Sequence, residues 1–303
     1  MWSFTPARWL IGLASFVLLI FLLVACTTGG ETAVSDTITP LPATFTPLPS
    51  PTTPVQPTTA VRQTPTPEAS EGQVDPPNQA PEQPEEAILI LEPGPGSRIA
   101  ASPLRVAGVA DPTFEQNLVI RLLLADGTEL ALVPTTIQAN IGERGAFEVE
   151  VPFAVSGEQQ AFVQVYATSA RDGGITHLSS VGITLADSGE SQIVPVEPHP
   201  ERIQISQPAL GATVSGGTVT VSGTALASFE QTLLVEVLDE AGEVLNAQPV
   251  TVEAPDLGQP GPFSLALSYE VSASMPGRIV VRDVSPAFGG DVHLASVEVT
   301  LEP

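Results

Sequence analysis

The sequence predicts an all-β fold of two tandem antiparallel β-sandwiches, preceded by a leader and a proline-rich stalk. Apolar and polar residues alternate with a period of two through most of the chain, and helical periodicity of any length is missing beyond the leader. Turn sequences such as Ala125-Asp126-Gly127 separate the alternating segments. The whole alternating region then occurs a second time, which predicts two similar domains.

Residues 1–25 have the layout of a secretory signal peptide, expected as a signal helix, with Arg8 followed by an uncharged apolar run. The run ends in Leu23-Val24-Ala25-Cys26, and Cys26 is the single cysteine of the chain. This tetrapeptide resembles the lipobox of bacterial lipoproteins, in which the cysteine is acylated and becomes the new N-terminus. The resemblance implies that Cys26 is the lipid-attachment residue, within a lipobox of Leu23, Val24 and Ala25. It also implies an extracytoplasmic protein whose acyl chains (a palmitate-type modification) hold it to the bacterial cell membrane.

Two other interpretations of the leader remain open. The apolar run is long enough to stay uncleaved as a single membrane-spanning anchor. Alternatively, Cys26 is an incidental residue of a signal peptide that is removed. The first alternative would still leave the rest of the chain tethered outside the membrane.

Residues 26–86 form a low-complexity tract with repeated Thr-Pro pairs, and the sequence predicts a disordered stalk. Proline removes backbone hydrogen-bond donors and threonine supplies little apolar area, so this tract cannot build a core. Two interpretations stay open for it, a passive flexible spacer and a stalk stiffened by O-glycosylation.

Composition excludes several function classes. The formal net charge is −24, so the surface repels nucleic acid and no nucleic-acid partner is expected. The chain contains arginine but no lysine, which excludes Schiff-base chemistry and the lysine of a phosphate-binding loop. With Cys26 assigned to the lipid, the domains have no disulfide and depend on their apolar cores.

The repeat defines the domain boundaries. Phe114-Glu115-Gln116 recurs as Phe229-Glu230-Gln231, at a spacing of 115 residues, and His177-Leu178 recurs as His293-Leu294, at a spacing of 116. We therefore expect domain 1 at residues 87–187 and domain 2 at residues 202–303. The proline-bearing link at residues 188–201 favours a semi-rigid spacer.

Seven short strands are expected in each copy, which favours a two-sheet sandwich. Val163 and Val165 are expected to point inward, as are their counterparts Ile279 and Val281. Arg121 and Glu236 occupy equivalent outward positions, and the reversal of charge predicts that both are solvated. In domain 1 the expected strands are Ile88–Leu91, Leu104–Val109, Leu118–Leu122, Glu129–Gln138, Phe147–Phe153, Ala161–Thr168 and Thr176–Leu185.

Each copy opens with an apolar pair, then Pro-x-x-Gly, then a strand ending in Val-x-Gly, then Phe-Glu and a further alternating strand. This order resembles the bacterial spore germination immunoglobulin-like domain family, and the resemblance covers both repeats almost fully. It implies two tandem immunoglobulin-like antiparallel β-sandwiches outside the membrane. It implies no catalytic residue, because the family has none established.

The candidate metal and catalytic residues favour structural roles. His177 and His293 are interpreted as structural hydrogen-bonding histidines, because no second histidine or cysteine lies near either one along the chain. Asp111 with Glu115 would offer calcium ligands, but the second copy has leucine in place of Asp111 and lacks a calcium-loop pattern. Glu115 and Glu230 lie in different domains, which favours turn capping over acid/base work. We therefore expect no catalytic residue, no metal and no cofactor.

One strand face differs between the copies. Opposite the inward valines, domain 1 carries Phe162 and Tyr166, and domain 2 carries Arg278 and Arg282. One interpretation is an interaction face, since exposed aromatic rings stack on ligands and arginines bind carboxylates or phosphates. The other is that these side chains pack on neighbouring strands or pair with local acids.

The function predicted from these features is that of a membrane-anchored binding or interaction module of the cell envelope, not an enzyme. Its partners would be the membrane, through acylated Cys26, and envelope proteins or wall polymer. The alternatives are a purely structural spacer, a solute- or ion-binding accessory module of a transporter, and an uncharacterised hydrolase.

Overall fold

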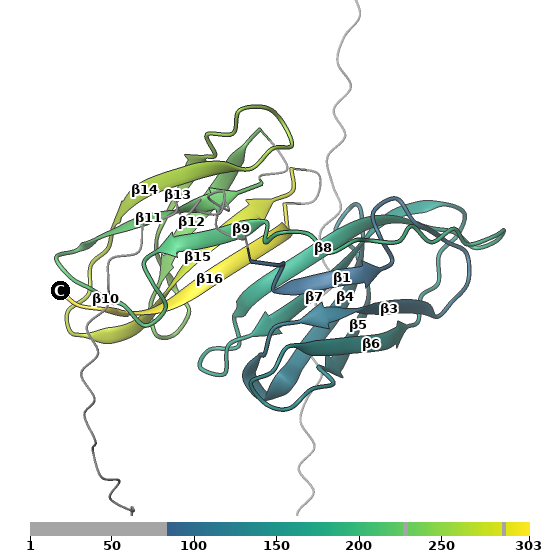
Figure 1. The fold of residues 1–303 in the computed structure, drawn as a ribbon, viewed down its shortest axis with the longest axis horizontal. Helices are drawn as coiled ribbons and strands as arrows, with labels where there is room; N and C mark the ends of the chain where they lie inside the picture. The colour runs from purple at the N-terminus through teal and green to yellow at the C-terminus, as the bar shows by residue number, and fades with distance from the viewer. Residues whose placement is uncertain (1–83, 227–229, 287–288) are drawn as a thin grey trace, which may run out of the picture. The chain divides into compact units, whose positions relative to one another are not determined.

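The computed structural model describes residues 84–226, 230–286 and 289–303 (Figure 1). The predicted signal helix, Cys26 with its lipobox, and nearly all of the predicted stalk lie outside these residues. Among the residues that are described, no helix has the length and apolar character needed to cross a membrane.

The first domain is a sandwich of two antiparallel sheets (Figure 1). One sheet has the order β1-β3-β6, and the other has the order β8-β7-β4-β5, with β2 running parallel to β8 at its edge. A single 3-10 turn precedes β4. The strands are β1 (Ile88–Glu92), β2 (Arg98–Ile99), β3 (Leu104–Ala110), β4 (Asn117–Leu124), β5 (Glu129–Thr136), β6 (Gly145–Val151), β7 (Gln159–Thr168) and β8 (Ile175–Leu185).

The second domain repeats this arrangement strand for strand. Its sheets have the orders β9-β11-β14 and β13-β12-β15-β16, and β10 runs parallel to β16 as β2 does to β8. The strands are β9 (Ile203–Gln207), β10 (Thr213–Val214), β11 (Thr218–Ala225), β12 (Thr232–Leu238), β13 (Val244–Thr251), β14 (Gly261–Ser268), β15 (Met275–Val284) and β16 (Asp291–Leu301).

The predicted fold class is confirmed, and each of the seven strands expected per copy is present. The strands β2 and β10 were not predicted, because two residues are too few to show an alternating pattern. Val163, Val165, Ile279 and Val281 are fully buried, as the alternation predicts.

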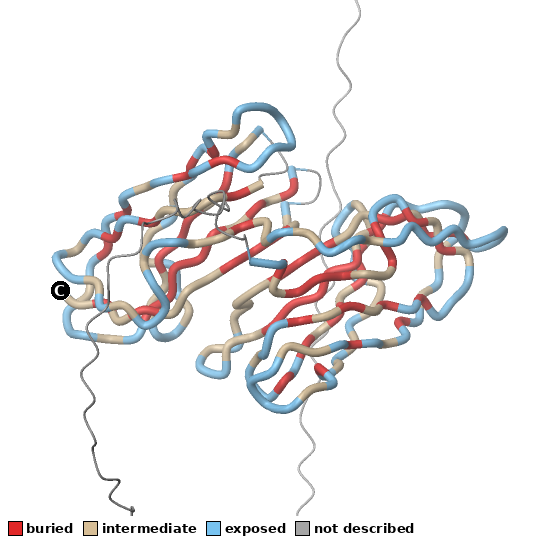
Figure 2. The backbone as a smooth tube through the Cα atoms, in the orientation of Figure 1, coloured by how far each residue is buried: buried red, intermediate tan, exposed pale blue. Residues whose placement is uncertain are grey.

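Each sandwich closes around its own apolar core (Figure 2). In domain 1 the inward residues of β4 and β7 pack against Phe147 of β6. In domain 2 the equivalent residues of β12 and β15 pack against Phe263 of β14. The two cores are separate, so each domain buries enough apolar side chains for a hydrophobic interior of its own.

Close backbone packing explains why glycine recurs at Gly108 and at its counterpart Gly223. A Cβ atom at Gly108 would lie 2.1 Å from the carbonyl oxygen of Leu89, and one at Gly223 would lie 2.0 Å from that of Gln204. Both glycines sit where the first strand of the domain shifts register against the next. Only glycine permits this close approach of two backbones.

The Glu-Gln pair of the repeated signature has a left-handed backbone in both copies, and in domain 1 its glutamine carries the structural contacts. The φ angles of Glu115 and Gln116 are 54° and 58°, and those of Glu230 and Gln231 are 47° and 54°. Buried Gln116 donates two side-chain hydrogen bonds of 3.0 Å, to the carbonyl oxygens of Asn140 and Glu143. The turn role expected for Glu115 therefore belongs to its neighbour, since the exposed Glu115 carboxylate accepts, within the described part of the chain, a single long hydrogen bond of 3.4 Å from Asn117.

The expectation that Arg121 and Glu236 are solvated is wrong for Glu236, which is 7% exposed. Its carboxylate accepts from Arg282 at 3.1 Å. Arg121 instead lies 5.4 Å from the ring centre of Tyr166, the residue equivalent to Arg282. Each copy thus supplies a partner that suits its own charge, so charge reversal did not indicate exposure.

Residues 188–201 are tied to domain 1 and are not a free spacer. Gln192 and Arg98 exchange two backbone hydrogen bonds of 2.7 and 2.9 Å, and Gly94 donates to Val194 at 2.9 Å. The guanidinium of Arg98 also donates to the carbonyl oxygens of Glu190 and Ser188. These bonds fix the path by which the chain enters domain 2.

Candidate functional site: the junction between the two domains

The two sandwiches meet along their equivalent edge strands, β8 and β16, which pair antiparallel. Leu178 lies opposite Leu294, and His177 lies opposite Ala295, so the two large sheets join into one of ten strands. Leu178 and Leu294 are equivalent residues of the repeat, so an approximate two-fold axis passes between them. We call this pairing and the side chains on its two faces the junction.

The outer face of the junction is apolar at its centre. Tyr166, Leu178, Val280 and Leu294 form a small buried cluster that is distinct from both domain cores. Gln164 extends it with a buried hydrogen bond of 2.5 Å to the carbonyl oxygen of Asp291 in domain 2. Burial of this apolar area favours association of the domains.

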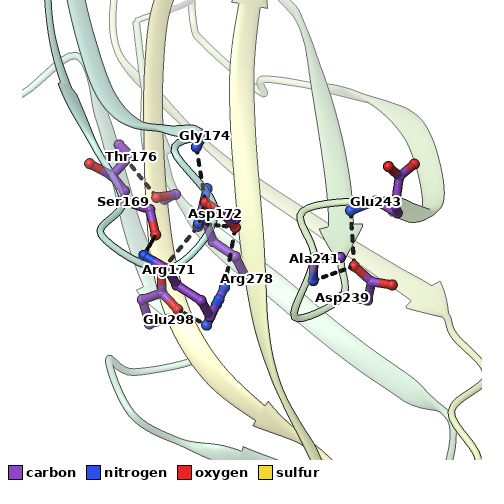
Figure 3. A network of polar contacts seen from close by, with 11 residues as sticks. Ser169, Arg171, Asp172, Gly174, Thr176, Asp239, Ala241, Glu243, Arg278 and Glu298 are labelled. Atoms are coloured by element: carbon purple, nitrogen blue, oxygen red, sulfur yellow. Dashed lines mark hydrogen bonds and ion pairs between the residues drawn. The ribbon is translucent and has the colours of Figure 1, made fainter. Parts of the chain in front are cut away.

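A buried ion pair crosses the junction beside this cluster (Figure 3). Arg278 of β15 donates to both oxygens of Asp172 at 2.6 and 2.5 Å, and the two side chains are 1% and 2% exposed. Asp172 lies in the loop between β7 and β8, where the amide of Gly174 also donates to it at 2.9 Å. Burial opposes ionisation of Asp172, but the hydrogen bonds from Arg278 and Gly174 outweigh it and lower the pKa of Asp172 to about 2.

Glu298 of β16 links two arginines of this network. It accepts from Arg278 at 3.1 Å and from Arg171 of domain 1 at 2.5 Å (Figure 3). The two carboxylates and two guanidinium groups therefore alternate across the junction, which satisfies charges that would be costly to bury alone.

The residues expected to form an interaction face lie largely within the junction. The interaction-face interpretation is wrong about the exposure of Tyr166 and Arg278, which are 9% and 1% exposed. Tyr166 packs in the apolar cluster and Arg278 pairs with acids, as the other interpretation expects. Arg282 pairs with Asp291 at 2.7 Å and with Glu236 at 3.1 Å, as the alternative interpretation of local ion pairs expects. Phe162 is partly buried and packs over Gly182 of β8.

The core-facing side of the junction gathers all three histidines of the chain around Glu86. The carboxylate oxygen Oε1 of Glu86 lies 4.0 Å from Nε2 of His177 and 3.9 Å from Nε2 of His293. The other oxygen, Oε2, lies 3.9 Å from Nδ1 of His199. We call Glu86, His177, His199, Glu201 and His293 the His/Glu cluster.

Glu201 completes the His/Glu cluster from the segment that enters domain 2. Its Oε1 lies 3.7 Å from Nε2 of His177, and its Oε2 accepts from the amide of Ala87 at 2.8 Å. Glu86 in turn accepts from the amide of Arg202 at 2.8 Å and from the hydroxyl of Ser179 at 2.7 Å. Although the sequence assigns Glu86 to the stalk, these bonds bury its side chain to 1% exposure.

Burial shifts the pKa values of two carboxyl groups and two imidazoles in the His/Glu cluster. It raises the pKa of Glu201 to about 7, and burial together with the charge of Glu201 raises the pKa of Glu86. Burial lowers the pKa of His177, and burial with the charge of Arg202 lowers the pKa of His293 well below its usual value. The imidazoles of His177 and His293 therefore resist protonation, and they lie next to carboxyl groups that resist ionisation.

Two clefts reach the His/Glu cluster. One of about 370 Å³ is lined by Glu86, His199, Glu201 and His293, and one of about 500 Å³ is lined by His177. Glu86, His177 and Glu201 each offer a ligand atom, and these atoms lie within 4.8 Å of one another. The expectation that neither repeated histidine has a second histidine nearby is therefore wrong in space, although it holds along the chain.

The sequence contains one signal that predicts the approach of His177 and His293. His-Leu occurs at the same position in the last strand of both copies. When two equivalent edge strands pair antiparallel, their equivalent residues meet at the axis, so the histidines next to Leu178 and Leu294 must come together. The contributions of Glu86 and Glu201 carried no such signal, because neither lies in a strand.

Comparison with known proteins agrees with this architecture. The family described as "Immunoglobulin-like domain of bacterial spore germination" matches residues 87–174 and again residues 202–290. No curated protein matches the chain.

Solved structures align over much of the chain at low similarity. A red sea bream transglutaminase shares 12% identity over 71% of this chain and 31% of its own, with a TM-score of 0.26. A dimeric latent PorU from Porphyromonas gingivalis shares 12% identity over 72% of this chain and 20% of its own, with a TM-score of 0.25. An I-band fragment of titin shares 11% identity over 71% of this chain and 65% of its own, with a TM-score of 0.20. The chain thus spans about a third or less of the length of the first two, and no functional property is transferred from any of them.

Proposed function

The chain belongs to the family of immunoglobulin-like domains of bacterial spore germination, and we propose that its two domains form a binding module of the cell envelope. The module acts by contact and not by catalysis, and its partner is an envelope protein or wall polymer. Membership of the family supports a binding or structural module, and the remaining steps of the proposal rest on the surface and on the leader.

The observation that carries the proposal is a pair of exposed apolar loop tips at equivalent places. Ile141, between β5 and β6, is 86% exposed, and Leu257, between β13 and β14, is 77% exposed. Each precedes a glycine with positive φ, Gly142 at 87° and Gly258 at 76°, which turns the loop outward. A lone exposed apolar residue needs no explanation, but the same feature in both copies favours contact with a partner.

Two equivalent contacts in one chain suit a repetitive or two-fold partner. The junction would hold the two tips at a set separation, so that binding of the first raises the effective concentration of the second. A wall polymer or an oligomeric envelope protein presents repeated sites of this kind.

The leader supports an extracytoplasmic, membrane-anchored location. Acylation of Cys26 within Leu23-Val24-Ala25-Cys26 would anchor the chain in the outer leaflet of the cell membrane, and the Thr/Pro-rich tract up to residue 83 would serve as the stalk. Replacement of Cys26 by serine is expected to prevent acylation and to change the fractionation of the protein, as followed by metabolic labelling with a clickable fatty acid.

The experiment is in-cell photocrosslinking from residue 141 or residue 257, with identification of the captured species. The double variant Ile141→Ser and Leu257→Ser is expected to lose that capture when the probe is placed next to either tip. Both side chains are exposed, so the fold should be unaffected.

Leu210→Ser is the matched control. Leu210 is as exposed as Leu257, at 77%, but proline (Pro95) stands at its position in the other copy. Its replacement should leave capture unchanged. If neither tip captures a species, or if the double variant and the control lose capture equally, the molecule is a spacer without specific contacts.

A further inference from the structure

The geometry of the His/Glu cluster leaves a space between three polar atoms. Nε2 of His177 is buried, has no hydrogen-bond partner among the described residues, and faces Oε1 of Glu201 at 3.7 Å and Oε1 of Glu86 at 4.0 Å. These separations are too long for hydrogen bonds. They are close to the separation of about 3.3 Å that ligand atoms have when they share a tetrahedral metal ion with bonds of about 2.0–2.1 Å.

The two carboxylates are already oriented by bonds that leave this space free. Glu201 uses Oε2 for the amide of Ala87 and turns Oε1 toward His177. Glu86 uses Oε2 for the amide of Arg202, and the hydroxyl of Ser179 donates to its Oε1. Hydrogen bonds of this kind fix the direction of metal ligands in known sites.

The electrostatics of the cluster also favour a cation. Two buried carboxyl groups lie side by side, and Asp111 contributes further negative potential to Glu201 and His177. Arg202 opposes this, since its charge acts on His293, but its backbone amide and not its guanidinium contacts Glu86. A divalent ion would offset the negative charge of the two carboxylates inside the junction, and the unpartnered Nε2 of His177 faces the same space.

We propose that Glu86, His177 and Glu201 bind a divalent transition-metal ion at the junction. One imidazole and two carboxylates form a borderline-hard donor set that suits Zn²⁺. His293, whose Nε2 lies 3.9 Å from Oε1 of Glu86, is the nearest further imidazole for the remaining position. The clefts of about 370 and 500 Å³ that the cluster residues line give the ion access.

Such an ion would clamp the two domains together. Glu86 precedes β1 and His177 lies in β8 of domain 1, whereas Glu201 stands two residues before β9 and His293 lies in β16 of domain 2. Since the ion would bind the paired state and not the separated one, it would stabilise the junction by mass action. This inference is independent of the loop tips and of any envelope partner.

The test uses the full chain, purified in detergent, stripped with EDTA and exchanged into chelator-free buffer at neutral pH. Titration with Zn²⁺ by calorimetry is expected to show about one ion per chain and to raise the melting temperature. Co²⁺ in place of Zn²⁺ should give the visible absorption of a low-coordinate nitrogen and oxygen site.

His177→Ala is expected to weaken Zn²⁺ binding at least ~100-fold, and the isosteric Glu201→Gln at least ~10-fold, which is the loss typical of disturbed metal sites. Glu298→Gln is the matched control, since it removes a junction carboxylate outside the cluster and should change the affinity less than threefold. Far-UV circular dichroism of each variant in EDTA shows whether it is folded, and Glu201→Gln preserves the shape of the side chain if His177→Ala does not fold.

Two results would overturn the proposal. The first is an absence of stoichiometric binding, with equal melting temperatures in Zn²⁺ and in EDTA. The second is binding that survives both substitutions, which would place the ion elsewhere on this acidic chain. Either result would leave the crosslinking experiment on Ile141 and Leu257 unaffected.

Discussion

The two domains share one fold but differ on the face that each turns toward the other. Inward positions such as Val163 and Ile279 are equally buried in both copies, and the turns that separate the strands recur. Outward positions differ, with Tyr166 beside Arg121 in domain 1 and Arg282 beside Glu236 in domain 2. The inward-facing residues therefore specify the sandwich fold, whereas the outward-facing residues adapt each copy to the junction.

The largest expected effect on stability comes from a pair of substitutions at equivalent positions of the two domains. Arg278→Ala leaves Asp172 buried without its main partner, and loss of one member of a buried ion pair costs about 3–5 kcal/mol. Phe162→Ala, at the equivalent position of domain 1, removes only partly buried apolar area and should cost about 1–2 kcal/mol. Urea unfolding followed by circular dichroism measures both, and equal losses would show that the two copies are not specialised.

Acid should weaken the junction through Asp172. The pKa of Asp172 is about 2 in the folded state, below its ordinary value of 3.8, so its contribution is present above pH 3.8 and is lost as the pH falls toward 2. The effect should be smaller than that of Arg278→Ala, because a protonated carboxyl group still accepts a hydrogen bond.

Asp172→Asn provides the reference for this pH effect. The variant should be less stable than the wild type at neutral pH, and its stability should change less between pH 4 and pH 2. Parallel profiles for the two proteins in acid would rule out Asp172 as the titrating group.

A backbone test should affect both domains alike. Gly108→Ala and Gly223→Ala each drive a methyl group toward a carbonyl oxygen, at 2.1 and 2.0 Å, and forced overpacking costs about 1–3 kcal/mol. The two variants should therefore lose similar stability in chemical denaturation. A loss confined to one of them would mean that the repeat is not structurally equivalent at this crossing.

The last contrast concerns the left-handed turn before β4, where one of the two substitutions should have almost no effect on stability. Gln116→Ala removes hydrogen bonds to two loop carbonyls and should cost about 1–3 kcal/mol. Glu115→Ala alters an exposed side chain and should change stability by less than about 0.5 kcal/mol. Thermal unfolding of the two single variants distinguishes the glutamine from the glutamate, and the reverse order would restore the role first expected for Glu115.

The sequence was sufficient for the fold because the fold depends on local alternation. Alternating apolar residues such as Leu118, Ile120 and Leu122 indicate a buried strand face, and the same pattern recurs in the second copy. The strands β2 and β10 could not be predicted, since two residues are too few to show alternation.

The junction was not predictable in the same way. Asp172 and Arg278 are 106 residues apart and carry no shared motif, and the exposure of Arg278 depends on which edge strands pair. Charge reversal between Arg121 and Glu236 was misleading, because each copy had acquired its own neighbour. Only the repeated His-Leu pair encoded part of the arrangement, through the symmetry of the pairing.

The most direct test of the account is the distance between the two domains in solution. Spin labels are placed at exposed residues 141 and 257 in a full chain carrying Cys26→Ser, and the distance is measured by double electron–electron resonance. Pairing of β8 with β16 predicts one narrow distance distribution that broadens in the Arg278→Ala variant. A broad distribution in the protein with native Arg278 would contradict the junction as described.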